Sequence, residues 1–542
     1  MILIQKIKYQ VVSLVISIAA VCLPTAAEAA ERIVFSLAPF GEFQVEVADL
    51  EAFIATGTRT SELDYYLKRL NSKQLTQLPG LLNTPLKLSP LAIANFSNSQ
   101  VGEITIKNFA KGVRSDRNQN GFYALRGAII AAAFDESKLT IINLLHHYPL
   151  KTIHLDLEVL AKYFQRANTI THNREAIERI WFSNLDRHQQ HQQNGDLNST
   201  KFRDRRKQLA PAIPGQYTWK KRTLAYQNPS RSRSGLFDLY QPTINRPVPV
   251  IAISHGIASN RQTFAYLGRH LASQGFAVAV IEHNEIGLDK FDRFLAGKAA
   301  FPDANNLINN PLDISSVLDR LESEPNLDLQ RVGLVGQSFG GYSALALSGG
   351  RLIADETAEE CQADSYPNVL LNLSSLARCA FNQLGQSQLE LRDSRIKAVM
   401  AINPMIEIFG REGMSSVEIP TMIISGTHDL IMPSVAEQIQ PFSWLNEDLT
   451  KYLVLIKPAT HFSFLQEGLG VLPVPDTNVG PRPVYAYPAL KALSTSFFQL
   501  HLARQMEYQT YLQSDRAAQL SNDAFELLVI RSIGEAELEK LQ

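Results

Sequence analysis

Runs of apolar residues alternate with amphipathic segments through the second half of the chain. Residues 248–253 and 276–281 are continuous apolar runs, which are typical of strands buried on both faces of a sheet. Between them, residues 261–273 carry apolar positions at helical spacing, and Gly275 follows as a residue that commonly ends a helix. This alternation predicts a parallel sheet with helices on both faces.

The alternation continues towards the C-terminus. Pro311 can open a helix, and the apolar positions after it lead to a strand at 332–335. Two earlier runs, 217–226 and 235–241, alternate in polarity and are separated by an Asn-Pro-Ser turn, which predicts an antiparallel pair. The remaining pattern predicts strands at 396–402, 421–425 and 452–456 and helices at 433–445 and 489–502.

Residues 33–164 follow another pattern. Alternating apolar residues near Phe43 predict one short strand, and the rest shows apolar residues at helical spacing, for example at 63–70 and 128–134. We expect a small, mainly helical domain here, without a catalytic constellation of its own. It is a candidate surface for contact with a protein or a lipid.

Shifts in composition mark the boundaries between these parts. Residues 184–208 are polar and rich in glutamine and arginine, as in a linker. An insertion at 349–394 interrupts the alternation, and we expect it to form a lid. The predicted organisation is a signal peptide at 1–29, a helical domain at 30–165, a linker at 166–214, an α/β domain at 215–510 and a helical extension at 511–542.

The first 29 residues have the pattern of a cleaved export signal. Lys6 and Lys8 precede an apolar stretch at 11–23 that is short for a membrane span, and residues 27–29 form a small-x-small cleavage site. We expect cleavage before Ala30, a mature chain without a membrane span, and a periplasmic or secreted protein. An uncleaved anchor is the alternative.

Composition and charge narrow the class of protein. The chain has 542 residues, 45% of them hydrophobic, and a formal net charge of −1. This length and apolar content allow a large buried core in more than one domain. The balanced charge gives no long-range attraction to nucleic acid, so we predict no nucleic-acid partner.

The cysteines fit an exported protein. Cys22 lies in the export signal, which leaves Cys361 and Cys379. In an oxidising compartment, two cysteines this close in sequence are expected to pair.

No metal or organic cofactor is predicted. Residues 116–121 copy the first half of a calcium loop, but Gly127 stands where the closing carboxylate is needed, so we prefer a polar turn. His188 and His191 lack further ligands in their glutamine-rich surroundings, which favours a solvated linker.

The segment Gly-Gln-Ser-Phe-Gly-Gly at 336–341 lies between a predicted strand and a run of small residues typical of a helix. In a sharp strand-to-helix turn, the central side chain is pushed clear of the backbone and the flanking positions have no room for a Cβ atom. The pattern predicts Ser338 as an exposed nucleophile.

A serine nucleophile needs a base and a carboxylate that orients the base. His461 follows the last predicted strand, and Asp429 follows the strand at 421–425. The order Ser, Asp, His is that of α/β-hydrolases. Glu407, which also follows a buried strand, is the alternative carboxylate.

Backbone donors must also stabilise the oxyanion. The strand at 248–253 continues into Ser-His-Gly-Ile, where Gly256 lets the backbone turn its amides towards the site. The predicted donors are the N–H groups of Ile257 and Phe339. We interpret His255 as a residue that holds this loop by hydrogen bonds, with a catalytic role as the alternative.

Four segments carry a resemblance to a known family. They are Ser-His-Gly at 254–256, Ala-Ser-Gln-Gly-Phe at 272–276, Ile-Glu-His-Asn at 281–284 and the segment at 336–341. Together they resemble the plasma-type platelet-activating-factor acetylhydrolases and related bacterial lipases and cutinase-like polyester hydrolases. The resemblance covers about residues 247–464. Residues 33–164 resemble a helical domain of uncharacterised function found ahead of hydrolases in some bacteria.

The resemblance implies an α/β-hydrolase fold and hydrolysis of short acyl or lipid-like esters by Ser338, Asp429 and His461, without a cofactor. In the acetylhydrolase branch, the acid follows the strand after the nucleophile, where this chain has Asn403. We therefore expect an exported serine ester hydrolase with a small-molecule or lipid ester as substrate. A serine peptidase of the same fold and a non-catalytic binding protein are the alternatives.

Overall fold

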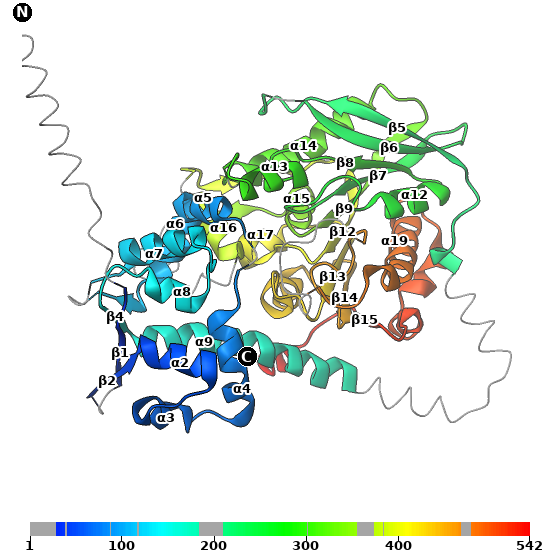
Figure 1. Cartoon of the computed structure of the whole chain (residues 1–542). Helices are drawn as coiled ribbons and strands as arrows, with labels where there is room; N and C mark the ends of the chain where they lie inside the picture. The colour runs from blue at the N-terminus through cyan, green and yellow to red at the C-terminus, as the bar shows by residue number, and fades with distance from the viewer. Residues whose placement is uncertain are drawn as a thin grey trace, which may run out of the picture. The chain divides into compact units, whose positions relative to one another are not determined.

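One sheet of nine strands organises the second half of the described chain, and helices cover both of its faces (Figure 1). The computed structural model describes residues 29–541 except 38–40, 87, 116–118, 184–209, 233, 301, 355–372, 383 and 468–478. The chain divides into two compact units, Met1–Ala161 and Lys162–Gln542, which we call unit 1 and unit 2.

The sheet of unit 2 has the strand order β15-β14-β13-β12-β9-β7-β8-β6-β5. The strands from β14 to β8 in this order are parallel, whereas β5, β6 and β15 pair antiparallel with their neighbours. This confirms the predicted α/β fold. The strands are β5 (Trp219–Tyr226), β6 (Gly235–Pro242), β7 (Val248–Ser254), β8 (Ala277–Ile281), β9 (Leu327–Gln337), β12 (Ile396–Ile402), β13 (Thr421–Gly426), β14 (Lys451–Lys457) and β15 (Glu526–Ile530).

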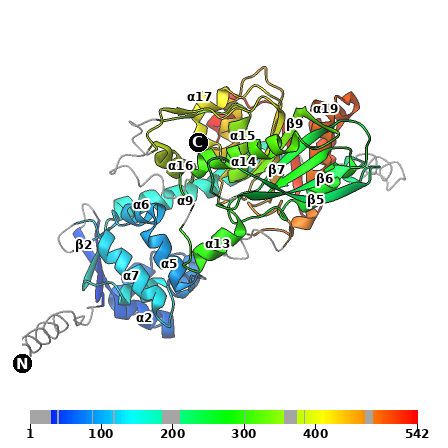
Figure 2. The same cartoon turned by 90° about the horizontal axis from the view of Figure 1, so that it is seen from above.

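Helices cover this sheet from two sides. Figure 2 shows α14 and α15 on one side of β7 and β9 and α19 on the other. The helices of unit 2 are α12 (Ala265–Ser273), α13 (Leu288–Leu295), α14 (Asn306–Leu321), α15 (Phe339–Leu347), α16 (Leu373–Asn382), α17 (Gly410–Ser415), α18 (Gln440–Trp444), α19 (Tyr487–His501), α20 (Ser514–Ala517) and α21 (Glu535–Glu539).

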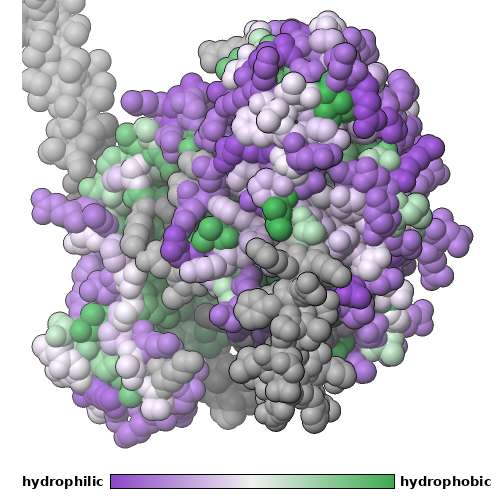
Figure 3. Space-filling view, turned by 90° about the vertical axis from the view of Figure 1, so that its right-hand side faces the viewer, coloured by the Kyte–Doolittle hydropathy of each residue, from purple (hydrophilic) through white to green (hydrophobic). Residues whose placement is uncertain are grey.

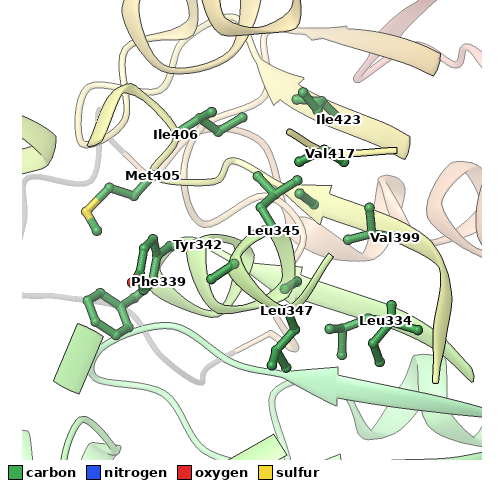
Figure 4. Packing of buried hydrophobic residues seen from close by; sticks show 14 of the residues in the cluster. Leu334, Phe339, Tyr342, Leu345, Leu347, Val399, Met405, Ile406, Val417 and Ile423 are labelled. Carbon is green, nitrogen blue, oxygen red and sulfur yellow. The ribbon is translucent and has the colours of Figure 1, made fainter. Parts of the chain in front are cut away.

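Both faces of the sheet are buried, as its continuous apolar runs predict. In β7, Val250 belongs to one hydrophobic cluster and Ile251 to another on the opposite face. Figure 4 shows the first cluster, where Leu345 of α15 packs with residues such as Val399 and Ile423 from the strands. All nine residues of α15 are buried, so the residue in front of this helix is held firmly.

Unit 1 is mainly helical, but it also contains a four-stranded sheet where the sequence predicts one strand. The strands are β1 (Arg32–Leu37), β2 (Gly41–Glu46), β3 (Val113–Arg114) and β4 (Thr152–Leu155), in the order β2-β1-β4-β3. The helices are α2 (Val47–Thr56), α3 (Ser61–Leu67), α4 (Ser72–Asn83), α5 (Pro90–Asn98), α6 (Gln100–Phe109), α7 (Phe122–Phe134), α8 (Ile141–His146) and α9 (Leu157–Ile177), which ends in unit 2.

The predicted linker at 166–214 begins too early. Helix α9 runs to Ile177 and continues as a π-helical turn, Glu178–Phe182. Ile177 and Phe182 are buried in the first cluster of unit 2. This apolar contact holds the first part of the predicted linker, up to Phe182, against unit 2. His188 and His191 lie outside the described residues.

The segment at 511–542 is not a purely helical extension. Strand β15 pairs with β14 at the edge of the sheet, and Leu527 and Val529 pack in the second cluster. Five residues of alternating burial are enough to extend the sheet, and they place this segment within the fold of unit 2.

The insertion at 349–394 is described in part. Its strands β10 (Leu352–Ile353) and β11 (Gln388–Leu389) pair antiparallel, and α16 follows the gap at 355–372. Cys379 of α16 is disulfide-bonded, whereas Cys361 lies outside the described residues. The pairing of these two cysteines and the lid function of the insertion stay predictions.

The surface gives no further sign of a partner on the face of unit 2 visible in Figure 3. That face is mostly hydrophilic, with hydrophobic residues scattered singly. Unit 1 exposes several large hydrophobic side chains, among them Leu81 (66%) and Tyr123 (77%). Its contact with a protein or lipid stays a prediction.

Among the described helices, none is both long and apolar enough to cross a membrane. Residues 1–28 of the predicted export signal at 1–29 and residues 116–118 of the calcium-like pattern lie outside the described residues.

Candidate active site

Ser338 occupies the turn between β9 and α15. Its backbone torsions, φ 56° and ψ −120°, lie in a region that residues with a Cβ atom rarely adopt. A Cβ atom on Gly336 would lie 2.1 Å from the carbonyl oxygen of Gly340, and one on Gly340 would lie 2.3 Å from that of Ser254. A residue with a Cβ atom would therefore clash at either glycine position, and the turn has the strained form of a nucleophile elbow.

The structure brings Asp429 and His461 together. The Nδ1 atom of His461 lies 2.7 Å from Oδ2 of Asp429. The other oxygen of Asp429, Oδ1, accepts hydrogen bonds from the N–H groups of Ile431 and Met432, both at 2.8 Å. Because a carboxylate only accepts, Nδ1 of His461 carries the proton and Nε2 is unprotonated, which is the state that a base requires.

Nε2 of His461 faces Gln337 in this structure. The side-chain Nε2 of Gln337 lies 3.2 Å from it, close enough to donate a hydrogen bond. Within the described residues, the Ser338 hydroxyl has no hydrogen-bond partner, so the structure does not join it to His461. Ser338 and His461 are both 7% exposed. Catalytic hydrogen bonds often form only when substrate is bound, so this arrangement is compatible with a resting site.

The loop after β7 passes directly beside the nucleophile. A Cβ atom on Gly256 would lie 2.8 Å from Cβ of Ser338. Ile257 follows on this loop, and Phe339 is the first residue of α15, where an N–H group has no acceptor within the helix. The two predicted oxyanion donors thus lie on the segments that meet at Ser338.

His255 is buried beneath this loop. Its Nδ1 atom lies 2.8 Å from the carbonyl oxygen of Gly256, and its Nε2 atom accepts the N–H group of His283 at 3.1 Å. Burial, together with the neighbouring His283, lowers the pKa of His255 to about 3. A ring that is 1% exposed and hydrogen-bonded at both nitrogens holds the loop and has no atom left for substrate.

Comparison with known proteins agrees with this architecture. The family described as "Alpha/beta hydrolase of unknown function (DUF1400)" matches residues 29–156, and that described as "Platelet-activating factor acetylhydrolase, isoform II" matches residues 238–287. The chain is 27% identical over 236 residues to Cutinase 1 of Thermobifida cellulosilytica, covering 43% of this chain and 68% of the relative. The chain has an α/β-hydrolase fold, and the proteins that it matches are described as cutinases and as an acetylhydrolase family.

Other relatives of this α/β-hydrolase are also cutinases. The chain is 27% identical to Cutinase of Thermobifida fusca (strain YX), covering 59% of that relative, and 25% identical to Cutinase 2 of Thermobifida cellulosilytica, covering 64%. The alignments span 43% and 42% of this chain. The match to the family of unknown function falls on unit 1, whereas the acetylhydrolase match spans the end of β6, β7, β8 and the loop beneath Ser338.

The α/β-hydrolase has an amide at the position where the acetylhydrolase branch is expected to carry its acid. Asn403 follows β12 with a positive φ of 42° and is fully buried. Its Oδ1 atom accepts the N–H group of Gly426 at 2.8 Å, and its Nδ2 atom donates to the carbonyl oxygen of Thr460 at 3.1 Å. Asn403 thus ties the loop of Asp429 to that of His461. Sequence reasoning gave it no role.

The alternative carboxylate, Glu407, lies in a short 3-10 turn after β12. Its N–H group donates to Oε2 of Glu437 at 3.1 Å, whereas the carboxylate hydrogen-bonded to His461 is that of Asp429. The geometry therefore favours Asp429 over Glu407.

Proposed function

We propose that this α/β-hydrolase is an exported serine esterase that cleaves carboxylic esters of short acyl or lipid-like substrates through an acyl-enzyme. Ser338 is the nucleophile, His461 the general base and Asp429 the residue that orients it. The observation that carries the proposal is the strained turn at Ser338 beside a buried Asp429–His461 pair with a 2.7 Å hydrogen bond. The likeness to cutinases and to an acetylhydrolase supports ester chemistry.

Acylation begins when Oγ of Ser338 attacks the ester carbonyl carbon and Nε2 of His461 takes the hydroxyl proton. The carboxylate of Asp429 stabilises the imidazolium that forms. The carbonyl oxygen becomes an oxyanion, which accepts hydrogen bonds from the N–H groups of Ile257 and Phe339.

The tetrahedral intermediate collapses when the C–O bond to the alcohol breaks and His461 returns its proton to that alcohol. Water then attacks the acyl-enzyme with His461 as base, which releases the acid and restores Ser338. Gln337 must release Nε2 of His461 before either proton transfer.

Export is proposed on separate grounds. The disulfide bond of Cys379 supports an oxidising compartment, where such bonds persist. N-terminal sequencing of the protein recovered from the periplasm or medium should begin at Ala30. A start at Met1 in membrane fractions would show an uncleaved anchor.

The esterase proposal is tested by labelling and turnover. A fluorophosphonate should add one label to Ser338, and p-nitrophenyl esters of increasing chain length should define the preferred acyl group. Ser338→Ala should abolish both signals. Ser348→Ala is the matched control, since Ser348 is buried at the other end of α15 with its hydroxyl bonded to the carbonyl oxygen of Ala344. A wild-type chain that neither labels nor hydrolyses any ester would contradict the proposal.

A further inference from the structure

A second serine, histidine and aspartate lie beneath the loop that carries Ile257. Oγ of Ser254 is 2.8 Å from Nε2 of His283, and Nδ1 of His283 is 3.0 Å from Oδ2 of Asp313. All three side chains are fully buried. Substrate cannot reach a serine with no exposed surface, so this array is not a second active site.

Both carboxylate oxygens of Asp313, the acidic member of the array, accept hydrogen bonds. The other oxygen of Asp313, Oδ1, accepts from Nδ2 of Asn228 at 2.7 Å and from Nε of Arg231 at 2.9 Å. Burial alone would raise the pKa of Asp313, but the hydrogen bond from His283 and the charge of Arg231 hold it below its ordinary value. Asp313 is therefore an ionised group with a partner on each oxygen, which is what a buried carboxylate requires.

The array is joined to the oxyanion loop through a backbone group. The N–H group of His283 donates to Nε2 of His255 at 3.1 Å, so Nε2 must be the unprotonated nitrogen. The proton of the neutral ring then lies on Nδ1, which donates to the carbonyl oxygen of Gly256 at 2.8 Å. The position of His283 thus decides both the tautomer and the orientation of His255.

Fixing the carbonyl oxygen of Gly256 also fixes the next N–H group. In a trans peptide, the C=O of one residue and the N–H of the next point in opposite directions within one plane. The peptide between Gly256 and Ile257 is trans, since Lys457-Pro458 is the one cis bond in the described chain. Holding the carbonyl oxygen on the His255 side therefore directs the Ile257 N–H group away from that side.

We propose that Asp313, His283 and His255 are positioning residues that aim the Ile257 N–H group at the oxyanion formed on Ser338. This inference rests on the proposed esterase function. None of the three touches substrate. Asp313 holds the ring of His283, the backbone of His283 holds His255, and His255 sets the plane of the donor peptide.

Two substitutions of His255 separate its two hydrogen bonds. The amide of asparagine lies near the position of Nδ1, so His255→Asn can still donate to the carbonyl oxygen of Gly256. The amide of glutamine lies near the position of Nε2, so His255→Gln keeps the bond from His283 but loses the donor to Gly256. We expect kcat to fall about 100-fold in His255→Gln, within the range for loss of one oxyanion donor, and less than tenfold in His255→Asn. KM should change less than threefold in both.

A remote substitution tests the start of the relay, by which we mean the hydrogen-bonded series Asp313, His283 and His255. Asp313→Asn should lower kcat by about tenfold or more with little change in KM, although it lies two hydrogen-bonded residues from the loop. The matched control is His270→Gln. His270 is also buried, and its Nε2 atom bonds to Thr495 and to the carbonyl oxygen of Pro211, away from the loop. This control should lose thermal stability without a selective loss of kcat.

Hydrogen exchange of the loop peptide at 254–258 gives a readout that does not depend on activity. Exchange there should become at least tenfold faster in His255→Gln and Asp313→Asn, and should stay unchanged in His270→Gln. If the wild-type protein hydrolysed no ester but the two variants still exchanged faster than it, the esterase proposal would be refuted and the relay would remain supported. An active enzyme whose relay variants keep kcat within threefold and exchange like the control would overturn the relay.

Discussion

Asp429→Asn is the sharpest test of the candidate triad, because the structure predicts the chemical state of the variant. Oδ1 of Asp429 accepts two N–H groups, from Ile431 and Met432, and an asparagine oxygen would stay there to keep both bonds. Its NH₂ group would then replace Oδ2, 2.7 Å from Nδ1 of His461. Two donors cannot face each other, so the ring would move its proton to Nε2 and lose its base.

The expected loss follows from that tautomer. A comparable substitution in a serine triad lowers kcat about 10⁴-fold, which corresponds to roughly 5.4 kcal/mol at about 1.36 kcal/mol per factor of ten. KM should change little, because Asp429 is 2% exposed and has no path to substrate. The change keeps shape and hydrogen-bond number, so the thermal midpoint should fall by only a few degrees.

The assay is steady-state turnover of the p-nitrophenyl ester that the wild type cleaves fastest. Glu407→Gln is the matched control, since Glu407 also follows a strand end but is not the carboxylate bonded to His461. It should lose less than about tenfold in kcat. If Asp429→Asn kept a tenth of the activity while Glu407→Gln lost 10⁴-fold, the acid would be Glu407 and the reasoning would be wrong.

Three further outcomes are expected. Peptide mapping without reduction should find Cys361 joined to Cys379, a bond worth on the order of 3 kcal/mol for a loop of this length, whereas alkylation of both thiols in native protein would contradict it. Burial raises the pKa of Glu437 from 4.5 to about 7, so its contribution to stability is full below pH 4.5 and is lost as pH rises through about 7. Glu437→Gln should flatten that fall in thermal melts at pH 4.5 to 8, and an unchanged slope would refute the assignment. Gly340→Ala would set a Cβ atom 2.3 Å from the carbonyl oxygen of Ser254, so we expect at least a 100-fold loss of turnover and a lower melting midpoint, and wild-type turnover would show that the elbow has room.

The sequence was most informative where local pattern and tertiary structure coincide. Strands buried on both faces must be apolar throughout, and the run at 248–253 appears as β7, Val248–Ser254. The elbow is partly local, since Gly336 is required by its contact with Gly340 in the same turn, whereas Gly340 is required by its contact with Ser254 of β7. These features predict the fold and the position of Ser338.

Long-range pairing was the part that the pattern could not reveal. In unit 1, β1 pairs in parallel with β4, and β3 is only two residues long. Strands β3 and β4 have only two and four residues, too few for a period-two signal. Strand β15 is also short, with five residues at the edge of the sheet, and the sequence pattern predicts a helical extension there.

The buried array was missed for a related reason. His283 and Asp313 become neighbours only when β8 and α14 pack together. One signal was present: Asp313 stands within a helix, and it is buried on the same side as Asn306 and Asn310. An acidic residue there requires a partner, although the sequence does not show which one.

The amide at Asn403 restricts how an enzyme of this kind can change. A carboxylate at this position could still accept the N–H group of Gly426, but it could not donate to the carbonyl oxygen of Thr460, and two acceptors would then face each other. If Asp429 is the acid, as proposed, Asn403→Asp would add a second carboxylate at the end of β12 and at the same time remove the hydrogen bond that holds the loop of His461.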